Sequence, residues 1–303
     1  MLKSAADFIN NRILGRLGIR LVRTKWLQED SILDQASSFA GEEAVLADLI
    51  KDIAPATRYY VDIGASDGTT WSNTVALARN GWHGLCFECD SAKIAAMAST
   101  YRTIGGVSVC QARITPMNVC GFLRAYGVSR DFGVLSVDID SYDWFVLKAV
   151  LSEFRPTIVV AEINEKIPPP LEFTVLYDAS YVWDGSHFYG MSIAQMEKLS
   201  KEYNYGIVRL EYNNVFLIDG RKYHGRCLSA DEAYDSGYRN RADRQKKFPW
   251  NADMEEALGM SPEEATSFVS RVFEKYAGRY SLSYSDESDI ADNRRHSHGW
   301  DRP

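Results

Sequence analysis

The sequence predicts an α/β fold built on a mostly parallel sheet with helices on both faces. From Tyr59 to Gly220, short apolar runs alternate with helix-like segments, which is typical of parallel sheets. The last two apolar runs flank Asn213-Asn214, a connection short enough for a hairpin. Strands are therefore expected at 58–63, 84–88, 107–112, 133–138, 157–163, 206–212 and 215–220.

A glycine-containing loop follows the first strand, and an acid ends the second. The loop has the spacing D-x-G-x-x-x-G from Asp62 to Gly68 and leads into a helix expected at 72–80. Glycines without Cβ atoms let the backbone approach a ligand, and the free N–H groups of a helix start attract negative charge. Glu88 at the end of the second strand is placed to accept both hydroxyls of a ribose. Together these features predict a site for a nucleoside-containing cofactor.

Polar side chains end the fourth and fifth strands. Asp138 and Asp140 end one strand, and Glu162 and Asn164 end the next. Side chains two residues apart share a face of a strand, and neighbouring strands lie about 5 Å apart. The four groups are therefore expected to converge on an oxygen-rich site that suits Mg²⁺ or Mn²⁺. Alternatively, these acids cap the next helix or contact solvent.

The glycine loop resembles motif I of the class I S-adenosylmethionine (SAM) methyltransferases, with Glu88 at the motif II acid. The resemblance covers roughly residues 40–220. It implies a Rossmann-like seven-stranded sheet of order 3-2-1-4-5-7-6 and SAM as the cofactor. The cofactor-binding positions that it implies are Asp62, Gly64, Ala65, Ser66, Asp67, Gly68, Glu88, Arg113 and Asp138. The third strand lacks the acid that many of these enzymes place near the adenine amine, so this role is expected near Arg113 or at Asn118.

The run 138–142, Asp-Ile-Asp-Ser-Tyr, is similar to the D-x-D-x-Y motif of metal-dependent sugar O-methyltransferases. Segments such as 156–164 also resemble FkbM-type methyltransferases. The resemblance implies that Asp138 binds the metal, together with Glu162 and Asn164, and that Asp140 is the general base. It also implies a sugar-containing small molecule or glycan as the acceptor. The sugar O-methyltransferases end the next strand with two adjacent aspartates, where this chain has Glu162-Ile163-Asn164.

A long connection is expected at 165–190, after the fifth strand. It is rich in aromatic residues, as expected around sugars or ring-shaped substrates, and connections of this length are often functional. Its single histidine, His187, is an alternative base or a neighbour of the metal. The competing interpretation is that the rings anchor the connection to the core and that His187 is hydrogen-bonded at the surface.

Composition limits the partners and the compartment. The net charge of −7 and a pI of about 5.4 provide no basic field for nucleic acid. Five cysteines without framework spacing indicate buried thiols in a reducing cytoplasm. No signal peptide and no run of eighteen apolar residues is recognised. We therefore expect a cytoplasmic protein.

The N-terminal segment 5–25 combines apolar residues with four arginines. Such a helix can lie on an anionic membrane at the inner face, or pack on the domain or on a second subunit of a homo-oligomer. We favour packing, because glycines within the segment weaken an isolated helix. A second helix is expected at 31–53 and another at 261–276, which opens with Ser-Pro-Glu-Glu.

Four regions follow from this interpretation. They are an N-terminal helical segment (1–55), a SAM-binding methyltransferase domain (56–222), a C-terminal helical extension (223–282) and a disordered tail (283–303). The predicted function is SAM-dependent, metal-assisted O-methylation of a sugar hydroxyl. Two alternatives remain: a non-catalytic SAM- or nucleotide-binding module of a biosynthetic complex, and a nicotinamide-dependent oxidoreductase. The absence of G-x-G-x-x-G counts against the oxidoreductase.

Overall fold

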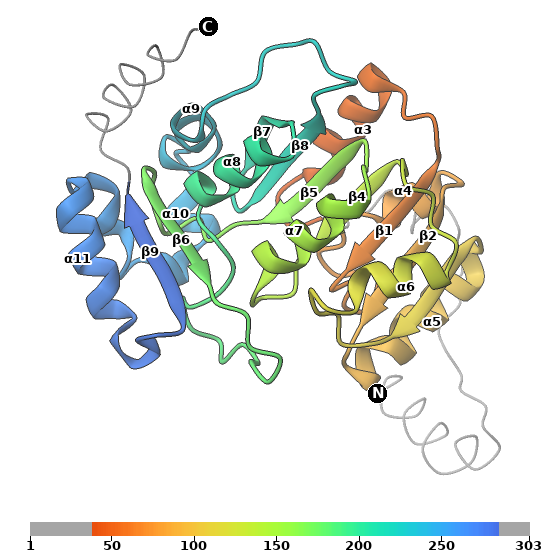
Figure 1. The fold of residues 1–303 in the computed structure, drawn as a ribbon, viewed down its shortest axis with the longest axis horizontal. Helices are drawn as coiled ribbons and strands as arrows, with labels where there is room; N and C mark the ends of the chain where they lie inside the picture. Colours follow the sequence, from red (N-terminus) through yellow and green to blue (C-terminus); the bar gives the residue numbers. More distant parts are fainter. Residues whose placement is uncertain (1–37, 285–303) are drawn as a thin grey trace, which may run out of the picture. The chain divides into compact units, whose positions relative to one another are not determined.

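The central sheet has the strand order β3-β2-β1-β4-β5-β8-β7 in the computed structural model, which describes residues 38–284 (Figure 1). Its strands are β1 (Tyr59–Ile63), β2 (His83–Glu88), β3 (Val107–Gln111), β4 (Val134–Val137), β5 (Ile158–Glu162), β7 (Tyr205–Glu211) and β8 (Asn214–Asp219). The first five are parallel, and β8 pairs antiparallel with both β5 and β7. Numbered within the sheet, this order is 3-2-1-4-5-7-6, which confirms the predicted fold class.

Helices cover both faces of the sheet. One face packs against α3 (Glu42–Ile53), α4 (Val75–Arg79) and α5 (Ser91–Ile104). The other packs against α6 (Val119–Ala125), α7 (Asp143–Glu153), α8 (Ile193–Glu202) and α9 (Ala230–Tyr234). Strands β1, β2, β4, β5 and β8 are buried on both sides, which explains their apolar runs, whereas the edge strand β3 is partly exposed. The predicted helix at 72–80 is shorter, because Ser72 and Thr74 form the turn that precedes α4.

A second, two-stranded sheet joins the connection after β5 to the end of the described chain. β6 (Leu171–Val175) pairs antiparallel with β9 (Tyr280–Tyr284), and both lie beside α11 (Pro262–Val272) (Figure 1). The segment 165–190 is therefore not an irregular connection throughout. The predicted tail is also wrong at its start, because residues 283 and 284 belong to β9. Two strands about a hundred residues apart leave no local signal of their pairing.

The C-terminal extension, residues 223–282, consists mostly of short helices and includes the start of β9. Besides α9 and α11 it contains η3 (Asp235–Arg239), α10 (Arg244–Lys247), η4 (Pro249–Asn251), η5 (Glu255–Gly259) and η6 (Glu274–Tyr276). Ser261 caps α11 through the predicted capping box with Glu264. The predictions for the segment 5–25, for the first part of 31–53 and for most of the tail fall on residues outside the described range.

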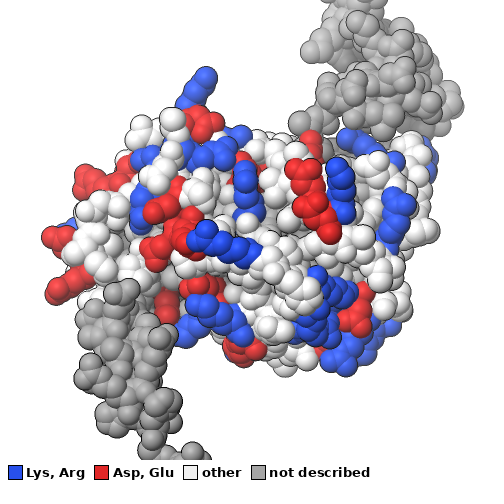
Figure 2. Space-filling view, turned by 90° about the horizontal axis from the view of Figure 1, so that it is seen from above, with Lys and Arg blue, Asp and Glu red and all other residues white. Residues whose placement is uncertain are grey.

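No helix within residues 38–284 is long and apolar enough to cross a membrane. On the face drawn in Figure 2, basic and acidic side chains are interspersed. That face therefore presents no continuous basic surface of the kind that binds nucleic acid.

Gly64, directly after β1, lies against the backbone of Asp138, directly after β4. It has a φ of 91°, and a Cβ built on it would overlap the carbonyl oxygen of Asp138. The glycine is thus required by the neighbouring strand, whereas the sequence suggested that it makes room for a ligand. Gly68, with a φ of 77°, instead packs against Met97 and Tyr101 of α5.

We expect Gly64→Ala to lower the free energy of unfolding by about 3 kcal/mol or more. The left-handed backbone costs about 1–2 kcal/mol for a residue with a Cβ, and the overlap with Asp138 adds an overpacking cost of about 1–3 kcal/mol. Urea denaturation measures the change. Gly81→Ala is the matched control, because Gly81 also has a positive φ but no described atom within 4 Å of the added Cβ. Equal losses for the two variants would refute the argument from close approach.

Candidate functional site

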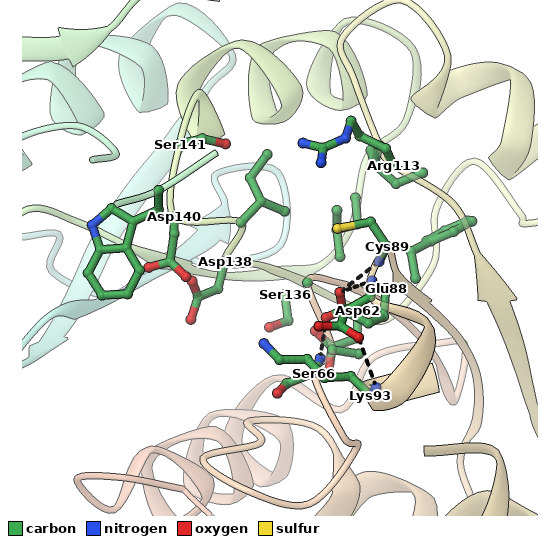
Figure 3. A pocket seen from close by; sticks show the side chains of 18 of the residues that line it. Asp62, Ser66, Glu88, Cys89, Lys93, Arg113, Ser136, Asp138, Asp140 and Ser141 are labelled. Atoms are coloured by element: carbon green, nitrogen blue, oxygen red, sulfur yellow. Dashed lines mark hydrogen bonds between the residues drawn. The ribbon is translucent and has the colours of Figure 1, made fainter. Parts of the chain in front are cut away.

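A cavity of about 580 Å³ opens at the carboxyl ends of β1, β2 and β4 (Figure 3), within the size range of small-molecule sites. Eight of the predicted cofactor-binding residues line it: Asp62, Gly64, Ala65, Ser66, Asp67, Glu88, Arg113 and Asp138. Gly68 does not, because it faces α5. We call this space the first cavity.

Glu88 ties the glycine loop to the end of β2. One carboxylate oxygen accepts the backbone N–H of Ser66 at 3.0 Å, and the other accepts those of Cys89 and Asp90 at 2.7 and 2.8 Å. The oxygen that binds Ser66 has a second lone pair to offer. Glu88 lines the first cavity and can still accept hydrogen bonds from a ligand there.

Two aspartates of the glycine loop have different environments. Asp67 accepts hydrogen bonds from Thr69 and Thr70. These bonds hold its pKa below the usual value, although burial acts in the opposite direction. Asp62 is buried, and its burial raises its pKa to about 6 in spite of hydrogen bonds from Thr74 and Ser136. Asp67 therefore shapes the loop as an anion, whereas Asp62 is an acid that titrates close to neutrality.

A second cavity of about 480 Å³ adjoins the first. Five residues line both cavities: Trp71, Asn73, Asp138, Asp140 and Trp183. Figure 3 shows Asp138 and Asp140 next to each other, away from Arg113 and Cys89. The two spaces therefore meet at a pair of carboxylates.

Asp138, Asp140 and Glu162 form a carboxylate cluster at this junction. One carboxylate oxygen from each lies within 4.8 Å of the others, and Asn213 donates to Glu162 at 2.8 Å. Burial and the charge of Asp140 raise the pKa of Asp138 well above its usual value. Burial and the charge of Asp138 do the same to the pKa of Glu162.

The pKa of Asp140 is also raised, to about 6, first by burial and then by Asp143. Lys93 and Lys166 act in the opposite direction on it. Close acids that repel one another bind either protons or a cation. Three converging carboxylates fit the oxygen donor set that Mg²⁺ and Mn²⁺ prefer.

Asn164 does not join this cluster, in contrast to the sequence prediction. Its side chain is buried, lines neither cavity, and donates to the carbonyl oxygens of His187 and Tyr189 at 2.8 and 3.0 Å. The strand ends at Glu162, so the alternation that would align the two side chains stops there. Asp140 takes the third place, since its φ of 54° lies outside the strand geometry.

His187 lines the second cavity, where its Nε2 lies 3.0 Å from a carboxylate oxygen of Asp253. Asp253 belongs to the C-terminal extension, and the sequence analysis did not identify it. A histidine paired with a carboxylate is a typical arrangement for a general base. This contact is the surface hydrogen bond of the competing interpretation, and the role of His187 as an alternative base stays a prediction.

A buried polar network that the sequence analysis missed also lines the second cavity. Lys166 donates to the Tyr189 hydroxyl at 2.6 Å and lies 3.2 Å from Glu165, and the Tyr189 hydroxyl donates to Glu165 at 2.9 Å. Asn251 donates to the same carboxylate at 2.6 Å. The signal in the sequence was a charged pair directly after the fifth strand. The hydrogen bonding of Glu165 also depends on Asn251, which lies far along the chain.

Aromatic side chains make up much of the second cavity wall. They are Phe39, Trp71, Trp183, Tyr189, Phe248 and Trp250. Trp71 and Trp250 are 67% and 54% exposed, which is costly for such large apolar groups unless something covers them. Phe188 is buried among other rings and anchors the connection 165–190 to the core, as the competing interpretation of these aromatic residues expects.

Adenine recognition had two candidates from the sequence. Arg113 lines the first cavity and donates to the carbonyl oxygen of Tyr181 at 3.3 Å. Asn118 instead closes a turn by hydrogen bonds with Thr115 and with the Arg113 carbonyl, and it does not line either cavity. Arg113 is thus the candidate that the geometry retains.

No family model matches the chain, and no curated protein matches it. Among solved structures, magnesium protoporphyrin IX methyltransferase from Synechocystis PCC 6803 is 11% identical over 72% of this chain and 98% of its own, with a TM-score of 0.40. CalS10, an amino pentose methyltransferase from Micromonospora echinaspora, is 11% identical over 66% and 99%, with a TM-score of 0.39. DesVI from Streptomyces venezuelae is 12% identical over 65% and 98%, with a TM-score of 0.39. The fold assignment rests on the strand order rather than on these similarities.

The carboxylate cluster predicts an unusual pH dependence of stability. Because the pKa values of Asp138, Asp140 and Glu162 are raised in the folded state, that state binds more protons than the unfolded chain. The metal-free protein should therefore lose stability as the pH rises from about 4 through 6 and above. Thermal unfolding between about pH 5 and 8, without and with Mg²⁺, measures this loss and its reversal by the cation.

Asp138→Asn removes one of the repelling charges and should raise the melting temperature of the metal-free protein near pH 8. Asp48→Asn, on the exposed side of α3, is the control for a general change in net charge. If Asp138→Asn and Asp48→Asn gave the same pH profile, mutual repulsion within the cluster would not be the cause.

Proposed function

Because the chain has the class I SAM-dependent methyltransferase fold, we propose that it is an O-methyltransferase that uses SAM. The proposed acceptor is a hydroxyl of a sugar-containing small molecule or glycan, and the proposed assisting cation is Mg²⁺ or Mn²⁺. The observation that carries the proposal is the shared boundary of the two cavities at Asp138 and Asp140. A methyl donor in the first cavity and an acceptor in the second would meet at these carboxylates.

SAM would occupy the first cavity. Glu88 would accept a ribose hydroxyl through the carboxylate oxygen that binds Ser66, since that oxygen accepts one hydrogen bond from the chain and keeps a second lone pair. Arg113 lines the cavity beyond the end of β3, where the adenine end of the cofactor would lie. The methyl group would then point toward Asp138 and Asp140.

The acceptor would occupy the second cavity. Its wall combines exposed indole rings with carboxylates, amides and a lysine. Sugars present apolar C–H faces to aromatic rings and hydroxyls to polar groups, so this wall matches a sugar better than a purely apolar ligand. Asp140, with a pKa of about 6, is ionised at neutral pH and would take the proton of the attacking hydroxyl.

Asp138 and Glu162 would hold the cation beside Asp140. A bound Mg²⁺ or Mn²⁺ would supply Lewis-acid polarisation of an oxygen and a fixed template. The residues of the chain contribute mainly by orienting the acceptor oxygen, the carboxylate and the methyl group in line. The sulfonium of SAM already provides a good leaving group.

His187 is the second candidate for the base, supported by its hydrogen bond to Asp253 and its place in the second cavity. A non-catalytic SAM-binding module remains the alternative from another class. The pair Asp138 and Asp140 on the boundary of the two cavities favours catalysis over that alternative. A nicotinamide-dependent oxidoreductase is the less favoured alternative, and titration with NADH followed by fluorescence would reveal it.

We expect S-adenosylhomocysteine (SAH), the product form of the cofactor, to bind in isothermal titration calorimetry. Glu88→Gln should weaken this binding about tenfold or more, because the hydrogen bonds of an ionised acceptor contribute about 1.5–3 kcal/mol. Glu197→Gln on α8 is the control for the loss of a surface charge. Absence of SAH binding by the wild-type chain would rule out the proposed function.

Removal of the cation by a chelator distinguishes cofactor binding from methyl transfer. EDTA should abolish methyl transfer and leave SAH binding largely unchanged, because the cation is assigned to the carboxylate cluster and not to the ribose site. Added Mg²⁺ or Mn²⁺ should restore the transfer. Asp138→Asn should reproduce the effect of EDTA. Transfer of the tritiated methyl group from SAM to sugar acceptors measures the activity. Full activity in excess chelator would show that the acids work without a metal.

A further inference from the structure

The first cavity is strongly acidic. Six of its lining residues are acids: Asp62, Asp67, Glu88, Asp90, Asp138 and Asp140. The cations on its described wall are Lys93 and Arg113. SAM carries a single anionic group, the α-carboxylate of its methionine part. An acidic wall repels this group, so a cation of the chain must offset the repulsion.

Arg113 is placed for another part of the cofactor. It donates to the Tyr181 carbonyl, and its charge acts on the Cys89 thiol and the Tyr142 hydroxyl. In Figure 3 it lies beside Cys89 and away from Ser66 and Lys93. The guanidinium therefore serves the side of the cavity beyond β3 and not the side where the glycine loop lies.

Lys93 is placed to offset the repulsion between the acidic wall and the α-carboxylate. It lies in the first turn of α5, where Asp90 fixes the backbone by accepting the N–H groups of Ala92 and Lys93. Within residues 38–284, no carboxylate lies within 4.0 Å of its ammonium group, in contrast to the paired lysines Lys148 and Lys198. Its side chain lines the first cavity, and Figure 3 shows Lys93 beside Ser66 and Glu88.

Lys93 thus lies on the side of the cavity that carries the glycine loop and Glu88. With the ribose on Glu88 and the methyl group at Asp138 and Asp140, the methionine part would run along this side, where Lys93 is the lining cation. Resting on the proposed function, we infer that the ammonium group of Lys93 binds the α-carboxylate of SAM. Asp62, the buried acid on the β1 side of the cavity, is the complementary partner for the α-ammonium group.

This assignment gives Lys93 a part in specificity. Adenosine, or a nucleoside without the amino-acid group, gains nothing from the lysine and still reaches Glu88. SAM and SAH gain a charge-assisted contact that offsets the field of the acids. Lys93 therefore selects for the amino-acid end of the ligand, whereas Glu88 selects for the ribose.

The test compares two ligands that differ in that group. SAH has the amino-acid part, and 5′-methylthioadenosine keeps the adenosine and the sulfur but lacks it. For the full chain in calorimetry, Lys93→Met should weaken SAH binding about tenfold, equivalent to about 1.4 kcal/mol, and change methylthioadenosine binding less than about twofold. Lys93→Arg should restore most of the SAH affinity. The loss should shrink in high salt, because Lys93 is exposed.

Arg102→Met is the matched control, since Arg102 lies on the same helix and outside the cavity. It should change neither affinity. Unchanged SAH binding in Lys93→Met, or equal weakening of both ligands, would overturn the assignment while leaving the proposed function intact. Failure of the wild-type chain to bind either ligand would overturn both.

Discussion

The repulsion among three half-buried carboxylates is the constraint on which the rest of the site depends. Asp138 and Glu162 end adjacent parallel strands, and Asp140 is turned toward them by its left-handed backbone. Carboxylates held this close together need a compensating proton or cation. The surrounding structure brings two lysines within electrostatic range, one from each cavity. The cluster, rather than the glycine loop, is therefore the point around which the two cavities are arranged.

The acceptor side is built from parts of the chain that are far apart. The connection 176–190 supplies Trp183, His187 and Tyr189, while the C-terminal extension supplies Phe248 and Trp250. The extension also fixes this connection through contacts such as Asp253 with His187 and Tyr276 with Ser186. The second cavity thus depends on residues after 223, whereas the first cavity does not use them. The proposed acceptor site therefore needs the C-terminal extension, whereas the proposed cofactor site is lined by residues that precede it.

The difference between local and long-range contacts explains what could be predicted from the sequence. Strand positions follow from apolar runs, and a ligand site follows from motif residues such as Gly64 and Glu88, whereas the strand order was implied by the resemblance to class I methyltransferases. The failure at Asn164 came from assuming that the strand continued beyond Glu162. The contacts of Lys166 with Tyr189, and of Glu165 with Asn251, depend on long-range packing. Such packing has no counterpart in local periodicity, so neither the network nor the β6–β9 pairing could be derived from a single sequence.

Glu88 accepts three backbone N–H groups, one from the loop after β1 and two from the turn after β2. Glu88 therefore holds the glycine loop and the turn after β2 together through hydrogen bonds. In evolutionary terms, this linkage restricts the paths by which the chain could acquire another nucleoside specificity. A replacement at Glu88 that suits a modified ribose would also leave Ser66, Cys89 and Asp90 without an acceptor. Drift toward a new cofactor would thus need paired changes in both loops, and intermediates that change one loop alone would be selected against as unstable before any gain in binding.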